Sequence, residues 1–406
     1  MKLEDKISPS FKNIRMSPIV TISELVKKKA PEFKAKTGRD FVCWQRGEVD
    51  FPTPAYIKTA ALEALEANKT KYPISGGEPK PKEAILKRLE RVYGARGLDA
   101  DHIVITFAAQ EALELSFGLF RGKKGAGFAP CWSCALENFI PYAEIDFTEV
   151  PLKKDFSIDY DILKKILDEP GMSLFYLNTP HNPTGKVFSK AEITRVAEMC
   201  KEREVCLISD EAYETIVYDG QKHFSASSID LDNIISTFTL SKSYSMTGWR
   251  LGYAVTRNKE IARLLKLGNY TQTAGVYTFG QYALEQAISN VHEEQKAVSA
   301  MVAGFARRRE VLYAGLSRIN GLTIDKPGGA FYMFPNFSNL IPKNLTGEER
   351  NKFIFNRLMN VGVATVYGSC FGRHFGDNVR VSFSTTPVPV IEDGIARVTE
   401  ALKGLG

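Results

Sequence analysis

The sequence predicts an α/β fold with a large, mostly parallel sheet and a smaller α+β part near the C-terminus. Short apolar runs alternate with amphipathic helical stretches through the middle of the chain, a pattern typical of a parallel sheet covered by helices. Over the last hundred residues the strand candidates are shorter and differently ordered. A length of 406 residues fits two or three domains. We expect an N-terminal segment over 1–50, a large domain over 51–295 and a small domain over 296–406.

Composition narrows the class of protein further. Hydrophobic residues make up 44% of the chain and charged residues 25%, an ordinary globular balance. No stretch of about 18–20 residues is free of charge, so we expect no membrane span. The net charge of +6 is spread along the chain, which favours small anionic ligands and does not call for nucleic acid. Six cysteines are too few for a disulfide scaffold, and the N-terminus lacks a secretory signal, so we expect a cytoplasmic protein.

The elements of the large domain follow in chain order. Apolar runs predict strands over 102–106, 125–129, 174–177, 205–209, 234–240 and 251–256. Helical stretches follow the first and third of these strands, over 110–120 and 189–203. Ser189 and Glu192 form the pattern of a capping box at the start of the second helix. Ligands of such a sheet bind at the carboxyl ends of its strands.

The two ends of the chain have elements of their own. Around residues 21–30 a helix is expected, which we place against the small domain. A long polar helix over 293–318 leads into that domain and couples it rigidly to the large one. The small domain has expected strands over 322–325, 330–334, 363–366 and 379–383, and expected helices over 347–360 and 390–402.

Two charged residues follow strands directly, and each has a structural and a chemical interpretation. Lys242 is surrounded by hydroxyl-bearing residues and is either an exposed lysine or a Schiff-base lysine, whose amine must be partly desolvated to react. Asp210 ends an apolar strand and needs a partner there. That partner is a helix start, an ion-pair cation or a protonated pyridine nitrogen, which would make the ring an electron sink.

Further strand ends supply groups that suit the other parts of such a ring. Pro183 restricts Asn182 in a rigid turn, from which its amide could donate to a phenolate-like oxygen. A helix begins after the strand that ends at Thr106, and free backbone N–H groups at a helix start bind phosphate. Arg250 offers a bidentate fork for the same anion. Together the strand ends predict a site for pyridoxal 5′-phosphate.

Seven ordered motifs carry a resemblance over nearly the whole chain. They are GEVDFPTP (47–54), KYPISG (71–76), NTPHNPTG (178–185), DEAY (210–213), SKSYSMTGWRLGY (241–253), PGGAFY (327–332) and RVSF (380–383). In these motifs the chain resembles the class I/II aminotransferases, pyridoxal-phosphate enzymes of fold type I. The resemblance implies a seven-stranded sheet in the large domain, which would bind the cofactor.

The resemblance also implies roles around the cofactor ring. Lys242 would form the Schiff base and carry the proton between substrate and cofactor. Asp210 would pair with the pyridinium nitrogen, and Asn182 and Tyr213 would hold the ring oxygen. Trp132 matches the aromatic residue that stacks on the ring.

The remaining implied roles concern the phosphate and the substrate. The phosphate would be held by the amides of Ala109 and Gln110 with Thr239, Ser241 and Arg250. Tyr72 would reach the phosphate of a second copy, which implies a homodimer. Arg380 would bind the substrate carboxylate, for which its guanidinium is suited, and the region of Gly47 would close over the substrate. The implied reaction moves an amino group from an L-amino acid to a 2-oxo acid, with 2-oxoglutarate favoured as acceptor, in ping-pong order.

Several positions depart from the family pattern. Ala108 stands where glycine is usual before the phosphate amides, and we expect it to serve if its φ stays negative. Arg46 either meets a substrate carboxylate or points to solvent or Glu48. Gln110 replaces a lysine of some aspartate-specific relatives. We expect the substrate side chain among Arg46, Gln110, Tyr253, Tyr270 and Tyr332.

Alternative functions remain open from the sequence. A pyridoxal-phosphate lyase or synthase would use the same fold and cofactor, because a fold does not settle the reaction type. A regulator without turnover is disfavoured because all the catalytic residue types are present. No dinucleotide-binding glycine motif opens a helix after a strand. Cys131 and Cys134 form a C-x-x-C pair without a second ligand pair, so we expect incidental thiols and no metal site.

Overall fold

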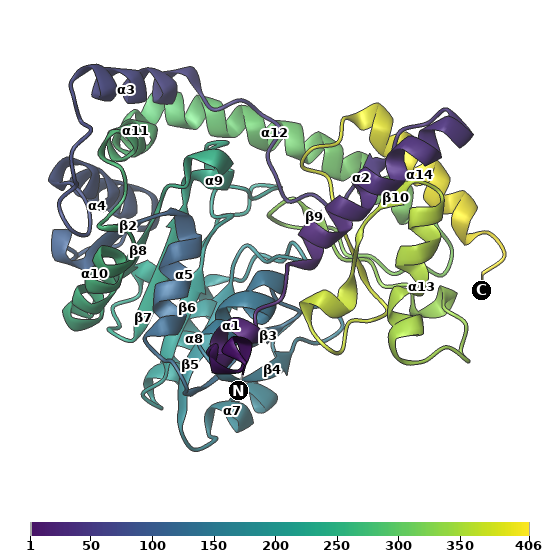
Figure 1. The fold of residues 1–406 in the computed structure, drawn as a ribbon, viewed down its shortest axis with the longest axis horizontal. Coiled ribbons are helices and arrows are strands. Elements are labelled where there is room, and N and C mark those ends of the chain that lie inside the picture. Colours follow the sequence, from purple (N-terminus) through teal and green to yellow (C-terminus); the bar gives the residue numbers. More distant parts are fainter. Residues whose placement is uncertain (1, 406) are drawn as a thin grey trace.

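A computed structural model describes residues 2–405, and its largest feature is a seven-stranded sheet (Figure 1). The fold class expected from the sequence is therefore confirmed. In spatial order the strands are β2 (Ile103–Thr106), β8 (Gly252–Thr256), β7 (Ile234–Thr239), β6 (Cys206–Asp210), β5 (Met172–Asn178), β3 (Lys124–Ala129) and β4 (Asp146–Pro151). Only β8 runs antiparallel to its neighbours, β2 and β7. Every other neighbouring pair is parallel.

This strand direction brings distant parts of the sequence to one edge. Asn178 pairs in register with Asp210, and Asp210 with Thr237 of the next strand. Because β8 is antiparallel to both neighbours, β2 has the same direction as β7, and Thr106 ends at the same edge. The carboxyl ends of β2, β5, β6 and β7 thus converge, as a parallel sheet requires.

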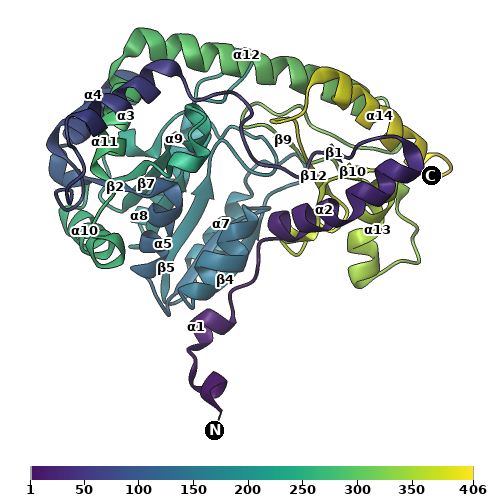
Figure 2. The same cartoon turned by 45° about the horizontal axis from the view of Figure 1, so that its top comes forward.

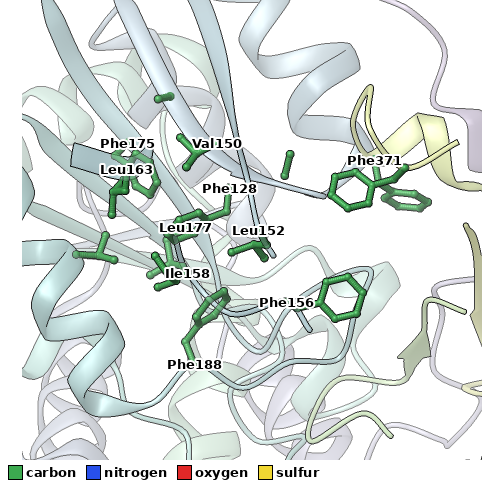
Figure 3. Packing of buried hydrophobic residues seen from close by; sticks show 14 of the residues in the cluster. Phe128, Val150, Leu152, Phe156, Ile158, Leu163, Phe175, Leu177, Phe188 and Phe371 are labelled. Atoms are coloured by element: carbon green, nitrogen blue, oxygen red, sulfur yellow. The ribbon is translucent and has the colours of Figure 1, made fainter. Parts of the chain in front are cut away.

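Successive side chains of a strand point to opposite faces of the sheet, and here both faces are apolar. Helices therefore cover both faces. Phe175 and Leu177 of β5 pack on one face, with residues of α7 (Tyr160–Leu167) and α8 (Lys190–Lys201) (Figure 3). Leu174 and Tyr176 pack on the other face, with α5 (Ala108–Gly118). Full burial of each such side chain contributes about 1.5–3 kcal/mol. Ser189 and Glu192 form the expected capping box of α8.

Four more helices pack around the β2 end of the sheet. They are α3 (Ala55–Glu66), α4 (Pro79–Tyr93), α10 (Lys259–Thr273) and α11 (Thr278–Ser289). Of these, α4 and α11 lie on one face of the sheet and α10 on the other. A short helix, α9 (Leu240–Ser243), directly follows β7 and carries Lys242 at the carboxyl edge of the sheet.

The C-terminal region, which we define as residues 317–405, has small sheets. Its elements are β9 (Tyr332–Met333), β10 (Val363–Ala364), β11 (Val366–Tyr367), β12 (Val379–Ser382), α13 (Gly347–Asn360) and α14 (Val388–Leu402). The helix expected over 347–360 is confirmed. The strand expected over 322–325 is wrong: Thr323 makes only an isolated bridge to Asn336. The strand expected over 363–366 is two short strands, which pair with different partners, β1 (Val42–Cys43) and β12.

A long helix connects the sheet with the C-terminal region, and the N-terminal helices lie nearby (Figure 2). This helix, α12 (Val291–Leu316), spans from α11 to α14. The predicted domain boundary at residue 296 therefore falls within a helix. Near the N-terminus, α1 (Pro9–Lys12) projects below the sheet in Figure 2, where Phe11 packs on Tyr142, and α2 (Pro18–Thr37) packs along the C-terminal region. Within residues 2–405, the structure has no helix that is both long and apolar enough to cross a membrane.

Candidate active site

A cavity of about 310 Å³ opens at the carboxyl edge of the large sheet. Its walls come from strand ends, from α5 and α9, and from both ends of the chain. The sequence-predicted residues on it are Gly47, Ala109, Gln110, Trp132, Asn182, Asp210, Tyr213, Thr239, Ser241, Lys242, Arg250, Tyr332 and Arg380. The fold therefore gathers at one place residues that are up to 333 positions apart, from Gly47 to Arg380.

Lys242 presents its amine to this cavity. The Nζ atom donates to the backbone oxygen of Gly47 at 2.6 Å. Among residues 2–405 no carboxylate lies within ion-pair distance of the amine. The Lys242 pKa is lowered to about 8, mainly by burial and also by the positive charges of Arg250 and Arg380, against a raising effect of Glu48. An amine with this pKa is partly neutral near pH 7–8 and can act as a nucleophile and as a base.

Asp210 is a buried carboxylate in the cavity wall. One of its oxygens accepts from the Tyr176 hydroxyl at 2.9 Å and the other from the Ala212 amide at 3.2 Å. Burial raises the Asp210 pKa to about 6, although both hydrogen bonds lower it. Within the described chain, no cation forms an ion pair with this carboxylate. A protonated ring nitrogen in the cavity would supply the missing charge.

Asn182, Tyr213 and Trp132 line the space between Asp210 and the C-terminal region. The Asn182 amide nitrogen of the backbone donates to the side-chain oxygen of Asn178 at 2.8 Å. Asn178 in turn donates to the Asp210 backbone oxygen at 2.9 Å. The Tyr213 hydroxyl lies 3.0 Å from the Tyr332 hydroxyl. These bonds fix the Asn182 backbone relative to β6, as the restricted turn predicts.

The opposite end of the cavity is rich in donors. Thr239 and Ser241 lie at the start of α9, where the Ser241 amide donates to the Thr239 hydroxyl. Arg250 donates to the Gln110 side chain at 3.0 Å. The first turn of α5 adds backbone N–H groups that have no partner within the helix. Hydroxyls, a guanidinium and a helix start form a set that binds phosphate.

Ala108 does not meet the condition under which alanine was expected to replace glycine here. Its φ is +60°, in the left-handed region, and not negative. The chain turns sharply between β2 and α5, and the Ala108 carbonyl accepts from the Thr106 hydroxyl at 2.9 Å. An alanine in this conformation is strained, and the surrounding contacts must hold it there.

Arg380 forms the wall on the side of the C-terminal region. Its guanidinium donates to the Gln45 backbone oxygen at 2.8 Å and to the Asn182 side-chain oxygen at 3.2 Å. It lies 4.3 Å from the centre of the Tyr332 ring. Its Nε atom is buried without a partner in the described structure. Because Arg380 also lines the cavity, its buried charge can meet an anionic ligand there.

Gly47 approaches the same wall closely. A side chain at this position would place its Cβ 2.6 Å from the Tyr332 hydroxyl. A larger residue here would therefore require the Tyr332 side chain to shift.

Four candidates lie away from the cavity of their own chain. Tyr253 is buried in the core and stacks on Phe238 at 4.9 Å, so its expected place near the substrate is wrong. Arg46 is exposed and does not line the cavity, as its solvent interpretation predicts. Tyr72 and Tyr270 are 90% and 60% exposed and also lie outside the cavity lining.

Other lining residues carried no recognisable sequence signal. Ser17, Ile19 and Val20 reach the cavity from the start of α2, and Leu113 reaches it from α5. These are ordinary apolar and small residues, and only the path of the N-terminal segment brings three of them to the site. Cys134, half of the C-x-x-C pair, also lines the cavity, and burial raises its pKa.

A buried ion cluster lies behind the cavity. Arg88 of α4 donates two hydrogen bonds to Glu214, at 2.8 and 3.1 Å, and one to Glu294 at 3.1 Å. Glu294, in the first turn of α12, also accepts from Arg91 at 2.7 Å and from the Tyr244 hydroxyl at 2.6 Å. The cluster ties α4 and α12 to Glu214, which follows Tyr213, and to Tyr244, two residues after Lys242. We call these five residues the ion cluster.

Comparisons with known proteins agree with this geometry. Residues 39–398 match the family described as aminotransferase class I and II. The chain is 35% identical to the probable aspartate/prephenate aminotransferase of Aquifex aeolicus, with 96% of this chain and 97% of that protein covered. It is 32% identical to the aspartate aminotransferase of Pyrococcus abyssi, over 90% of this chain and 92% of that protein.

Solved structures show the same arrangement. The aspartate aminotransferase of Thermus thermophilus with maleate aligns with a TM-score of 0.88 at 28% identity, covering 99% of this chain and 100% of that one. An aromatic aminotransferase of Pyrococcus horikoshii aligns with a TM-score of 0.82 at 31% identity, covering 92% of this chain and 98% of that one.

Proposed function

The chain belongs to aminotransferase class I and II, and we propose that its cavity binds pyridoxal 5′-phosphate and attaches it through Lys242. Members of this family depend on pyridoxal phosphate and move an amino group from an amino acid to a 2-oxo acid. One observation carries the cofactor assignment. The partly desolvated Lys242 shares a cavity with the buried Asp210 carboxylate and the buried Arg380 guanidinium, neither of which forms an ion pair within residues 2–405. The lysine matches the aldehyde of the cofactor, the carboxylate matches its ring nitrogen, and the guanidinium matches a substrate carboxylate.

When bound, pyridoxal phosphate supplies an electron sink that acidifies the Cα–H bond of an amino acid. The Lys242 amine removes and returns the proton, since its lowered pKa keeps part of it neutral. Asp210 holds the ring nitrogen in its protonated form, and Asn182 and Tyr213 donate to the ring oxygen. Trp132 covers one face of the ring. Arg380 orients the substrate through its carboxylate, beside Gly47.

We assign the phosphate to the donor-rich end of the cavity. There it is held by the amides of Ala109 and Gln110 and by Thr239, Ser241 and Arg250. Tyr72 completes this end from a second copy of the chain in a homodimer. Its 90% exposure, outside its own cavity, supports this role.

For the substrates we propose aspartate as amino donor and 2-oxoglutarate as acceptor. The names of two relatives, an aspartate/prephenate and an aspartate aminotransferase, support aspartate. An aromatic donor is the second candidate, because Ile19, Val20 and Leu113 line the cavity and one structural neighbour is an aromatic aminotransferase. The comparisons do not favour a lyase or synthase.

We propose a cytoplasmic location, in line with the low cysteine content and the absence of disulfides among the six cysteines. We also propose the division into a segment over 1–50, a cofactor domain over 51–295 and a small domain over 296–406.

Absorption spectroscopy tests the proposed function. The purified protein, loaded with pyridoxal phosphate, should show a visible band that bleaches with aspartate and returns with 2-oxoglutarate. Bleaching by phenylalanine and not by aspartate would select the aromatic donor. Release of ammonia or pyruvate with an unchanged spectrum would contradict transamination, and failure to take up the cofactor would contradict the assigned site.

A further inference from the structure

The turn between β2 and α5 is held in an unfavourable backbone conformation. Ala108 has a φ of +60°, where L-residues other than glycine and asparagine are uncommon. The backbone of Gly252 on β8 packs directly against it, since an added Cβ at Gly252 would lie 2.7 Å from the Ala108 carbonyl carbon. The next two amides, of Ala109 and Gln110, are those assigned to the phosphate. An error in this turn would therefore misdirect the phosphate donors.

Glu111 is joined to this turn by a reciprocal pair of hydrogen bonds. The Phe107 amide donates to Oε2 of Glu111 at 2.6 Å, and the Glu111 amide donates to the Phe107 carbonyl at 3.4 Å. The side chain thus reaches back over the first turn of α5 to the N-cap amide, from one position later than the acidic residue of a capping box. The hydrogen bonds between Phe107 and Glu111 thus join the two ends of the strained turn.

The other oxygen of Glu111 is anchored to a separate helix. Oε1 accepts from the Asn269 side chain at 3.1 Å and from the Thr273 hydroxyl at 3.4 Å, both on α10. Glu111 and Asn269 are buried, with 6% and 0% exposure. The carboxylate therefore connects the turn to a fixed support and not to solvent.

We propose that Glu111 is a positioning residue for phosphate binding: it holds the Phe107–Ala108 turn so that the following amides face the phosphate. This inference rests on the proposed cofactor site. The role is geometric. A carboxylate near a bound phosphate repels it, so charge alone would make Glu111 unfavourable there. Burial raises the Glu111 pKa above its ordinary value, although the bonds from Phe107, Asn269 and Thr273 oppose this shift by stabilising the ionised, accepting form.

The geometric role predicts which substitution is tolerated. In Glu111→Gln, the side-chain oxygen can still accept from Phe107, while the new NH₂ group needs an acceptor. The Oδ1 atom of Asn269 is buried without a partner in the described structure and can accept that bond after small adjustments. Glu111→Ala removes all these bonds and releases the turn.

The test measures binding of two ligands to the apoprotein by quenching of tryptophan fluorescence, without reference to turnover. Pyridoxal phosphate contains the phosphate, and pyridoxal lacks it. Glu111→Ala should weaken pyridoxal phosphate binding about tenfold or more, the usual effect of losing a hydrogen bond to a charged group. It should change pyridoxal binding less than about twofold, within ordinary context dependence. Glu111→Gln should bind pyridoxal phosphate at least as tightly as the wild-type protein.

Two further variants separate positioning from general damage. Glu114→Ala is the matched control, because Glu114 lies one turn along α5 and also accepts from α10, through Gln272 at 3.0 Å. It should leave both affinities unchanged. Ala108→Gly should reduce the effect of Glu111→Ala in the double variant, since glycine adopts the turn without strain.

The outcomes distinguish the inference from the proposed function. Equal weakening for both ligands in Glu111→Ala, or no weakening for pyridoxal phosphate, would overturn the positioning role. A wild-type apoprotein that binds neither ligand would overturn the cofactor site and the inference together. Loss of pyridoxal phosphate affinity in Glu111→Gln would show that charge, not geometry, is responsible.

Discussion

Arg88 and Arg380 are both buried arginines near the same site, but their surroundings differ in kind. Arg88 is 2% exposed and makes three hydrogen bonds to the carboxylates of Glu214 and Glu294. Arg380 is fully buried and donates only to an amide oxygen and a backbone oxygen. In residues 2–405 no carboxylate forms an ion pair with it. The charge of Arg88 is balanced by carboxylates of the protein, whereas the charge of Arg380 has no such counter-ion.

The same contrast separates the cavity from the ion cluster as a whole. In the cluster, two arginines face two glutamates, so the charges cancel. In the cavity, Lys242, Asp210 and Arg380 have no counter-ions among the described residues, and the pKa values of Lys242 and Asp210 are shifted toward the neutral forms. Uncompensated buried charge is costly and is retained where a ligand completes it. We therefore interpret the cluster as scaffold and the cavity as site.

Lys242→Met should give the largest effect and the sharpest form of this contrast. Turnover should fall by roughly 10²–10⁴-fold or more, since the proton-transfer group and the cofactor attachment are lost together. The apoprotein should nevertheless be more stable at pH 7. Because burial lowers the Lys242 pKa to about 8, its ammonium form is disfavoured in the folded state below that pH. Steady-state rates and thermal unfolding of the apoprotein measure the two effects.

Lys186→Met is the matched control for this variant. Lys186 forms an ion pair with Glu192 at 2.8 Å, so its loss should not stabilise the protein. A destabilised Lys242→Met apoprotein would show that the lysine belongs to the scaffold.

Arg88→Met should act in the opposite direction. It leaves Glu214 and Glu294 buried with fewer counter-ions, so the free energy of unfolding should fall by about 3–5 kcal/mol. Arg263→Met removes an exposed ion pair to Glu260 and should cost less than about 1 kcal/mol. Urea unfolding compares the two. Equal effects of the two substitutions would remove the distinction between cluster and surface.

Asp210→Asn should reveal a pH-dependent penalty at the site. The Asp210 pKa is raised to about 6, so the wild-type apoprotein loses stability as pH rises from about 4 through 6. The shift from an ordinary value near 3.8 corresponds to about 3 kcal/mol, which the variant should regain at pH 7 but not at pH 4.

The exposed carboxylate of Asp168 provides a control of opposite sign. Bonds from Lys164 and Arg203 lower its pKa, so its contribution to stability is present above its ordinary pKa and is lost as pH falls. Asp168→Asn should therefore reduce stability at pH 7. A pH-independent difference between Asp210→Asn and wild type would argue against the buried, uncompensated charge.

Arg380→Lys should give the smallest of these effects on free energy. A lysine keeps the charge but cannot form the bidentate pair with a carboxylate. Losing one charge-assisted bond, about 1.5–3 kcal/mol, should raise KM for the amino donor roughly 10- to 100-fold. Arg350→Lys is the control, because Arg350 pairs with Asp377 in the C-terminal region. A change in kcat alone would place Arg380 outside substrate binding.

The sequence predicted the sheet and its carboxyl edge because both depend on local pattern. Lys242, Asp210 and Asn182 lie at or shortly after the ends of apolar strands, and parallel strands bring such positions together. The left-handed backbone of Ala108 was missed, although the glycine usual at this position is the residue that favours such a backbone. The packing of Gly252 and the bonds of Glu111 hold the alanine in it.

Residues brought in by long-range packing were also missed. Ile19 and Val20 look like any apolar pair in a helix, and Tyr253 has the residue type of a substrate contact although it faces the core. Arg88 lies on an amphipathic helix and reads as an exposed charge, and only its tertiary partners, 126 and 206 positions away, explain its burial. Composition and local spacing do not predict contacts between residues so far apart in the sequence.

The length of α12 has a mechanical consequence. Its first turn is fixed at the ion cluster through Glu294, and its far end packs against α14, where Gly315 meets Ile395 (Figure 2). With 26 residues at about 1.5 Å each, the helix is a rod of roughly 39 Å. A tilt of about 5° at the cluster would displace its far end by roughly 3 Å, the length of a hydrogen bond. The ion cluster thus fixes the direction of α12, and its rigidity limits how far the C-terminal region can move relative to the sheet.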